Sequence, residues 1–197
     1  MTARFASLER QCWLFAVGSS FFALATLPGF PALAGAGATN TLCFIGSWFF
    51  TTAAWMQLML ADRGIGWWSA ATQFSGTLLF NLSTGASVWA HAVLAERRYV
   101  WAPDATGSLA FLISGALSVL AVGVWAPNSI DWRAAWINMM GCVAFGVSAL
   151  AAFVRKTGVT VDERLANFGT FVGALCFLAA ALLTQPRLSR WLTRAPD

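Results

Sequence analysis

One short pattern recurs six times along the chain, and it restricts the fold more than any other feature. In each copy a glycine is followed four residues later by a phenylalanine, and the residue directly after the glycine is small. The six copies are Gly18 and Phe22, Gly46 and Phe50, Gly76 and Phe80, Gly107 and Phe111, Gly141 and Phe145, and Gly173 and Phe177. Successive glycines lie 28, 30, 31, 34 and 32 residues apart, which fits one long helix and a short connection per copy.

The repeat also places a small residue seven positions after each glycine and, in most copies, a small or weakly polar one eleven positions after it. On a helix with about 100° between residues, these positions and the phenylalanine fall within about 60° of one another. Small residues let helices in lipid approach closely. We therefore expect this face to be the packing face, with each phenylalanine filling the space that a neighbour's glycine leaves.

The composition places the chain in a membrane. Of its 197 residues, 58% are hydrophobic and 10% are charged, and the mean hydropathy is +0.67. Soluble proteins have roughly 25% charged residues. A membrane span needs about 20 mostly apolar residues, so the length leaves room for six spans. We predict an all-α, polytopic transmembrane bundle forming a single domain over residues 1–197. The expected spans are 13–27, 41–60, 69–94, 105–125, 132–154 and 165–183, followed by a short basic tail over 186–197.

The beginning of the chain allows a second interpretation. Arg4 and Arg10 precede an apolar run, and residues 31–35 resemble a signal-peptidase site, as in a cleaved signal peptide. We favour a retained first span because residues 15–25 carry the repeat of the later spans. Removal of residues 1–34 stays open as the alternative.

Basic residues set the expected orientation. The side that holds both termini and the second and fourth links carries seven, which are Arg4, Arg10, Arg63, Arg133, Arg187, Arg190 and Arg194. The other side carries five, which are Arg97, Arg98, Arg155, Lys156 and Arg164. Positive residues favour the cytoplasmic side, so we predict a multi-pass protein of a bacterial inner membrane with both termini in the cytoplasm. Lipid phosphates explain the basic tail as a short interfacial helix, and no nucleic-acid partner is expected.

Polar residues within the spans are the candidate site residues. Gln57, Gln73 and Asn138 lie on or beside the repeat face. They serve either as hydrogen-bonding contacts between helices or as the polar lining of a small-molecule pocket. Asp104 and Asp131 are interpreted as N-caps of the fourth and fifth spans, and no charged residue is expected in the middle of a span.

The remaining reactive side chains form no recognisable motif. The four cysteines and His91 lack zinc-ligand spacing, and the cysteines are expected to be packing residues, with His91 an interfacial side chain. Phosphate loops, nucleophile elbows and paired carboxylates are missing from the sequence. The sequence therefore predicts no catalytic, metal or cofactor-binding residues and a protein that is not an enzyme.

The first two repeats carry a family resemblance. The stretches Phe15-Ala-Val-Gly-Ser-Ser-Phe-Phe and Cys43-Phe-Ile-Gly-Ser-Trp-Phe-Phe resemble the YrhK-type domain of bacterial membrane proteins. The resemblance covers roughly residues 10–60, and segments near Gln73 and Trp101 are similar to longer members of that group. It implies pairs of short spans, and it implies no activity and no catalytic residues.

Two functions follow as expectations. The first is a non-enzymatic scaffold or partner subunit that acts through helix packing, in contact with the bilayer and with a membrane-protein partner or a second copy of itself. The alternative is a small channel or transporter for a neutral or amphipathic solute. A dry bundle axis would favour the scaffold, whereas an open cavity lined by the glutamine and asparagine residues would favour transport.

Overall fold

The protein is an all-helical bundle, as predicted. The computed structural model describes residues 7–90 and 92–186. Within them the long helices are α1 (Leu8–Thr26), α2 (Phe30–Leu60), α3 (Ile65–Ala86), α5 (Ala102–Val122), α6 (Ile130–Ala151) and α7 (Glu163–Thr184). The short α4 (Val93–Ala95) and a π-helical turn, η2 (Glu96–Trp101), lead directly into α5. These described residues contain no strand, only an isolated bridge between Val154 and Thr160.

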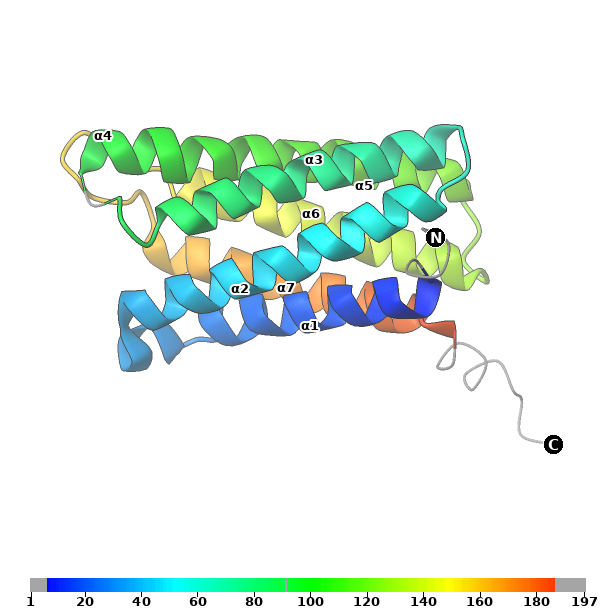
Figure 1. Ribbon diagram of the computed structural model, residues 1–197, viewed down its shortest axis with the longest axis horizontal. Coiled ribbons are helices and arrows are strands. Elements are labelled where there is room, and N and C mark those ends of the chain that lie inside the picture. The colour runs from blue at the N-terminus through cyan, green and yellow to red at the C-terminus, as the bar shows by residue number, and fades with distance from the viewer. Residues whose placement is uncertain (1–6, 91, 187–197) are drawn as a thin grey trace.

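The long helices lie side by side in an elongated bundle, with neighbours running in opposite directions (Figure 1). Each helix packs against the next along the chain, and α7 returns to pack against α1, so the ring is closed. The most extensive contacts join α1 with α2, α3 with α5, and α6 with α7. The bundle is thus built from three helical hairpins around one axis.

The repeat forms the contact inside each hairpin. A Cβ atom added to Gly76 of α3 would lie 2.7 Å from Phe111 Cε1 of α5, and one added to Gly107 would lie 2.7 Å from Phe80 Cδ2 of α3. The same reciprocal contacts join Gly18 with Phe50, Gly46 with Phe22, Gly141 with Phe177, and Gly173 with Phe145. Each glycine therefore makes room for the ring of its hairpin partner.

The six phenylalanines of the repeat meet at the bundle axis. They are 3–6% exposed and form one buried cluster. Phe80 stacks on Phe111 with 4.9 Å between ring centroids, and Phe145 stacks on Phe177 at 5.2 Å. Phe22 contacts Phe145 edge to face at 6.2 Å, across two hairpins. We call this cluster the phenylalanine layer.

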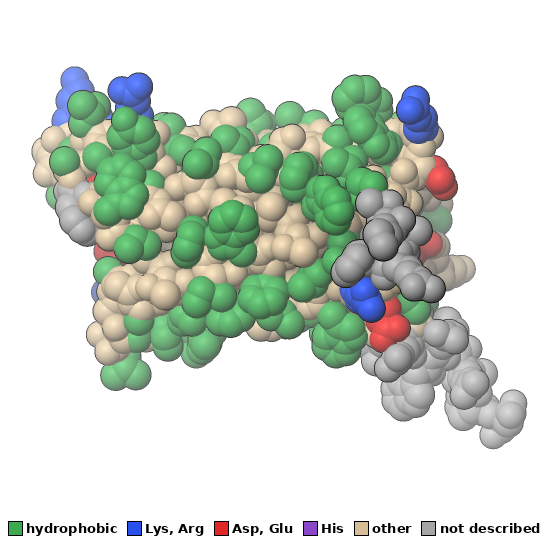
Figure 2. All heavy atoms as spheres, viewed as in Figure 1, with side chains coloured by type: hydrophobic (Ala, Val, Ile, Leu, Met, Phe, Trp, Pro, Cys, Tyr) green, Lys and Arg blue, Asp and Glu red, His purple; other side chains and the backbone are tan. Residues whose placement is uncertain are grey.

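The outer surface suits a membrane. Apolar side chains cover the visible flank of the bundle, whereas Lys, Arg, Asp and Glu gather at its two ends (Figure 2). Four helical runs are long and apolar enough to cross a bilayer: Phe30–Leu60, Val93–Val122, Ile130–Ala151 and Glu163–Thr184. A helical membrane protein is supported, while the crossing of α1 and α3, and so the count of six spans, stays a prediction.

Several helices have bounds that differ from the expected spans. The third span was expected over 69–94, but α3 ends at Ala86. The second was expected from residue 41, but α2 begins at Phe30, where Pro31 is tolerated in the first turn, and bends at Gly35. Gly35 has φ 79° and ψ 165°, a conformation that favours glycine.

The fourth span was expected from residue 105, but its helical run begins at Val93. The first, fifth and sixth spans were expected over 13–27, 132–154 and 165–183. The ends of α1, α6 and α7 differ from these bounds by one to five residues.

Two expected N-caps also differ. Asp104 caps no helix, because Trp101 and Ala102 before it already have helical backbone angles. The cap of α6 is Ser129, whose hydroxyl accepts a hydrogen bond from the Trp132 amide, and Asp131 lies in the first turn. Asp162 caps α7 in the same way through the Leu165 amide.

Candidate functional site

A cavity of about 270 Å³ with a mixed polar and apolar lining lies on the bundle axis. It extends from Phe50 and Phe177 of the phenylalanine layer toward the end of the bundle where α1 begins and α7 ends. We call it the axial cavity. Its lining comes from all six long helices, so its shape depends on the whole bundle.

The repeat explains which residues line the axial cavity. Helices α1, α3 and α6 contribute the residue three positions before the glycine, and the antiparallel α2, α5 and α7 contribute residues seven or eleven positions after it. These residues are Phe15, Gln73 and Asn138 in the first group and Gln57, Ser114, Ser118, Ala180 and Thr184 in the second. Neighbouring helices run in opposite directions, so positions before and after the glycine meet at one level. The structure thus brings Gln57, Gln73 and Asn138 together.

The carboxamides are the chemically distinctive part of this lining. Gln73 is only 5% exposed, and its Oε1 has no hydrogen-bond partner among the described residues. Oε1 of Gln57 is also buried without a partner there. Asn138 makes one weak contact, from Nδ2 to Cys142 Sγ at 3.8 Å. Buried polar groups in proteins nearly always have partners, and a missing one costs about 1–3 kcal/mol. These amides are therefore placed to bind a ligand that enters the cavity.

Three of the four hydroxyl groups of the lining are already engaged. Ser69 Oγ donates to the Ser114 carbonyl at 2.8 Å, and Ser114 Oγ donates to the Ser69 carbonyl at 2.8 Å. Thr184 Oγ1 donates to the Ala180 carbonyl at 3.0 Å. Their protons are used within the bundle, and their free lone pairs remain as acceptors. The reciprocal serine bonds also join α3 to α5. The carboxamides and the Ser118 hydroxyl are left as the groups that can both donate to and accept from a ligand.

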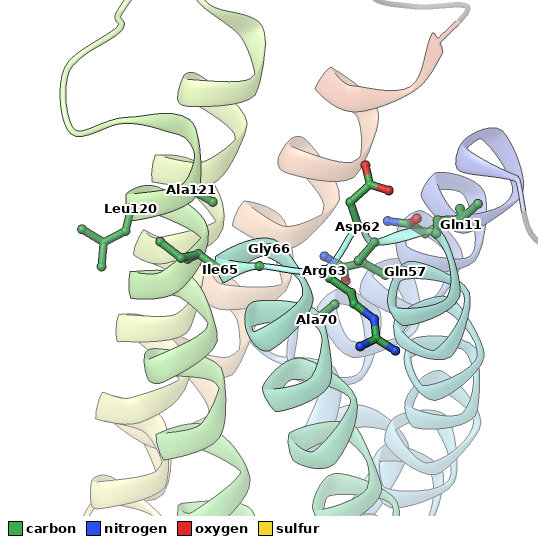
Figure 3. Close-up of a pocket in the computed structure, with 12 residues that line it drawn as sticks. Gln11, Gln57, Asp62, Arg63, Ile65, Gly66, Ala70, Leu120 and Ala121 are labelled. Atoms are coloured by element: carbon green, nitrogen blue, oxygen red, sulfur yellow. The ribbon is translucent and has the colours of Figure 1, made fainter.

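A wider hollow of about 550 Å³ lies at the mouth of the axial cavity (Figure 3). Gln11 and Gln57 line both spaces. Asp62 and Arg63 of the α2–α3 link add one charge of each sign to the hollow. Among the described residues, the axial cavity itself has one charged lining residue, the exposed Asp131. The deep part of the cavity therefore matches an uncharged polar ligand.

Across the phenylalanine layer, many of the polar groups bind one another. Ser148 contacts Thr170 at 2.8 Å between their hydroxyl oxygens, and Thr84 Oγ1 donates to Ser47 Oγ at 3.1 Å. Nearer the end of the bundle that holds the α6–α7 link, Trp101 Nε1 donates to the Ala149 carbonyl at 2.9 Å. Asn81 differs, since its Oδ1 is buried without a partner in the described chain. The two halves of the bundle are therefore unlike. At the far end, a hollow of about 690 Å³ is lined, among the described residues, from α1, α2, the link between them and α7 only, and its polar residues include Asn40, Glu163 and Arg164.

The other sequence-based expectations have different outcomes. The twelve glycines and phenylalanines of the repeat lie at helix contacts. His91 and the basic tail from residue 187 on lie outside the described residues. Within the described part of the chain, no three His, Cys, Asp or Glu side chains are placed to hold a metal ion.

One candidate residue was missed. Asp104 follows Pro103 and so resembles a cap, yet it lies three positions before Gly107, in the register that places Gln73 and Asn138 at the axis. That register was visible in the sequence and could have identified it.

Comparisons with protein-family models, curated proteins and solved structures find no match to this chain. The resemblance to YrhK-type domains is not tested by them and stays a prediction. Any function therefore has to be argued from the axial cavity and its residues.

Proposed function

We propose that the protein is a transporter of a small, uncharged, polar solute across a bacterial inner membrane. In this proposal all six long helices cross the bilayer, and the axial cavity is the solute site. The observation that carries the proposal is Gln73, a buried side chain that lines the axial cavity and whose carboxamide oxygen has no hydrogen-bond partner among the described residues. The single charged residue of the lining, Asp131, is exposed at the edge of the cavity, which favours an uncharged solute.

The phenylalanine layer closes the path along the bundle axis, so the proposed protein is a transporter and not an open pore. The space left among its six rings, Ser47 and Thr77 is only about 10 Å³. A cavity needs at least about 10–15 Å³ of such space to hold one water molecule. A solute bound beside Gln73 would therefore pass only when rings of the layer move apart. The stacked pairs are each contributed by one hairpin, so relative movement of hairpins is the simplest opening motion.

The scaffold function remains a prediction, and the axial cavity argues against it. Helices that act only through packing gain nothing from buried amides without partners, because each one costs stability. A cavity of about 270 Å³ is slightly below the usual range for small-ligand sites, which supports a ligand of few atoms.

Transport is tested with the full chain in lipid vesicles. Vesicles are mixed with a hyperosmotic solution of urea or of glycerol, and light scattering follows solute entry. We expect wild-type protein to speed entry of at least one of these probes over protein-free vesicles. Gln73→Leu removes the amide at nearly the same size, and it should reduce the protein-dependent rate at least tenfold.

The matched control is Ser75→Leu, two residues further along α3. Ser75 is exposed on the outer side and its hydroxyl donates to the Ala71 carbonyl of its own helix at 3.0 Å. This variant should keep the wild-type rate. Rates equal to those of protein-free vesicles for wild-type protein would contradict transport of these solutes, and equal losses in both variants would contradict the role of Gln73.

A further inference from the structure

A carboxyl group lies within one of the helical runs that are long and apolar enough to cross a membrane. Asp104 is the twelfth residue of the helical run Val93–Val122, which is 30 residues long and apolar enough to span a bilayer. With a rise of 1.5 Å per residue, it lies about 16 Å from the beginning of the run and about 9 Å beyond Arg98, the last charged residue before it. Ionisable residues within membrane spans are rare and mark ion or proton paths. Nothing in the proposed transport of a neutral solute uses this group.

The repeat register gives Asp104 a defined place in the bundle. It precedes Gly107 by three residues, as Gln73 precedes Gly76 in the hairpin partner α3. Since α5 runs opposite to α3, Asp104 lies on the far side of the phenylalanine layer from the axial cavity. Its side chain is partly buried.

Asp104 forms no ion pair with the described residues. The arginines on its own helical run are engaged elsewhere, and the other described cations at this end of the bundle, Arg155, Lys156 and Arg164, belong to the α6–α7 link and the beginning of α7. Arg97 donates from Nε to the Val154 carbonyl, and its guanidinium lies 4.8 Å from the Phe153 ring centre. Arg98 lies 5.5 Å from the Tyr99 ring centre.

The helices packed on this part of α5 supply no counter-charge either. Helix α3 has no titratable residue along its length. Helix α6 carries Asp131 and Arg133 at its beginning, at the opposite end of the bundle from Asp104, and Cys142 near the phenylalanine layer. Apart from Arg97 and Arg98, the turn η2 contributes Glu96 and Tyr99, and neither is a cation.

We propose that Asp104 is a proton-binding site within the membrane, separated from the axial cavity by the phenylalanine layer. A carboxylate in a medium of low polarity, with no cation beside it, is expensive to maintain. Taking up one proton from water converts it to a neutral carboxylic acid and removes that cost. The site releases the proton only when water or a cation reaches it. This assignment does not depend on the axial cavity binding a solute.

Infrared spectroscopy of the full chain in lipid vesicles tests the site directly. The C=O stretching band of a protonated carboxylic acid is separate from the bands of carboxylates and of the peptide backbone. We expect this band at neutral pH in the wild-type protein, and we expect its loss in Asp104→Asn. Asp131→Asn, which changes an exposed carboxyl group, should leave the band in place.

Three results would overturn the proposal. The first is the absence of the band from wild-type protein at neutral pH. The second is its persistence in Asp104→Asn. The third is its disappearance when sodium ions are added at constant pH, because the carboxyl would then bind a metal cation in place of a proton. If Asp104→Asn does not fold, Asp104→Glu keeps the acid and should shift the band.

Discussion

At the scale of single residues, the glycines of the repeat are the least replaceable positions. A Cβ atom on Gly141 would lie 2.7 Å from Phe177 Cε1 and 3.0 Å from Cys176 Cβ. Phe177 cannot move freely, because it packs within the phenylalanine layer. Overpacking of a core typically costs about 1–3 kcal/mol. We expect Gly141→Ala to lower the free energy of unfolding by about 1–3 kcal/mol, measured by reversible denaturation in mixed micelles.

Gly37→Ala provides the matched control for Gly141→Ala. Gly37 is also helical, in α2, but a Cβ atom added to it would meet no other atom within 4 Å. Alanine there should be neutral or stabilising by up to about 1 kcal/mol, as expected from helix propensity. Adding Phe177→Leu to Gly141→Ala should recover part of the loss. Equal costs at both glycines would contradict the contact with the phenylalanine.

The sequence predicts the repeat face residue by residue, but not the partner of each residue. Offsets of four, seven and eleven residues follow from helical geometry, so they identify the side chains that share a face. Pairing Gly76 with Phe111 requires knowing that α3 and α5 form a hairpin. The role of Gln73 likewise depends on empty space around it, and the volume left between six helices is not a property of any one of them.

At the scale of elements, the segment before α5 shows where sequence patterns mislead. Glu96, Arg97 and Arg98 resemble the end of a span, and Pro103 resembles the beginning of the next. The structure instead continues helically from Val93 through a π-helical turn into α5, where Pro103 is the second residue. Arg97 and Trp101 bind carbonyls of residues 57 and 48 positions away. Such distant partners cannot be inferred from a local pattern.

Trp101 anchors η2, the turn before α5, to the end of α6, and this contact can be tested. Its Nε1 donates to the Ala149 carbonyl at 2.9 Å, and its ring contacts Phe153 edge to face at 4.8 Å. Trp101→Phe keeps an aromatic ring and removes the donor, so the Ala149 carbonyl loses this partner. We expect a loss of about 1 kcal/mol in stability and faster amide hydrogen exchange in residues 149–156.

Trp13→Phe is the control for the anchor. Trp13 is 52% exposed on α1, and its replacement should change neither stability nor exchange near residue 150. Unchanged amide hydrogen exchange of residues 149–156 in Trp101→Phe would show that the bond from Trp101 to the Ala149 carbonyl does not hold η2 against α6.

At the scale of the whole molecule, three hairpins of one design surround an axis whose two halves differ. The repeat fixes what the hairpins share, which is the glycine contact and the phenylalanine layer. The residues three positions before the glycines supply the differences: Phe15, Gln73 and Asn138 on one side, Cys43, Asp104 and Thr170 on the other. In the transporter that we propose, the phenylalanine layer is the central barrier, and unlike polar groups lie on either side of it.

The bundle also makes a definite prediction about its orientation. The α2–α3 link lies at one end, whereas residues 87–90 and the α6–α7 link lie at the other (Figure 1). Single cysteines are introduced as Asp62→Cys, Val88→Cys and Thr157→Cys, at exposed positions, with the four native cysteines replaced by alanine. In intact bacterial cells, a membrane-impermeant maleimide should label positions 88 and 157. It should label position 62 only after permeabilisation, since the basic residues favour a cytoplasmic side for both termini and the α2–α3 link.

The pair 62 and 88 flanks α3, so labelling of both from the same side would show that α3 does not cross the bilayer and would contradict six spans. Labelling of position 62 alone in intact cells would keep the crossings and reverse the orientation, placing the mouth of the axial cavity outside.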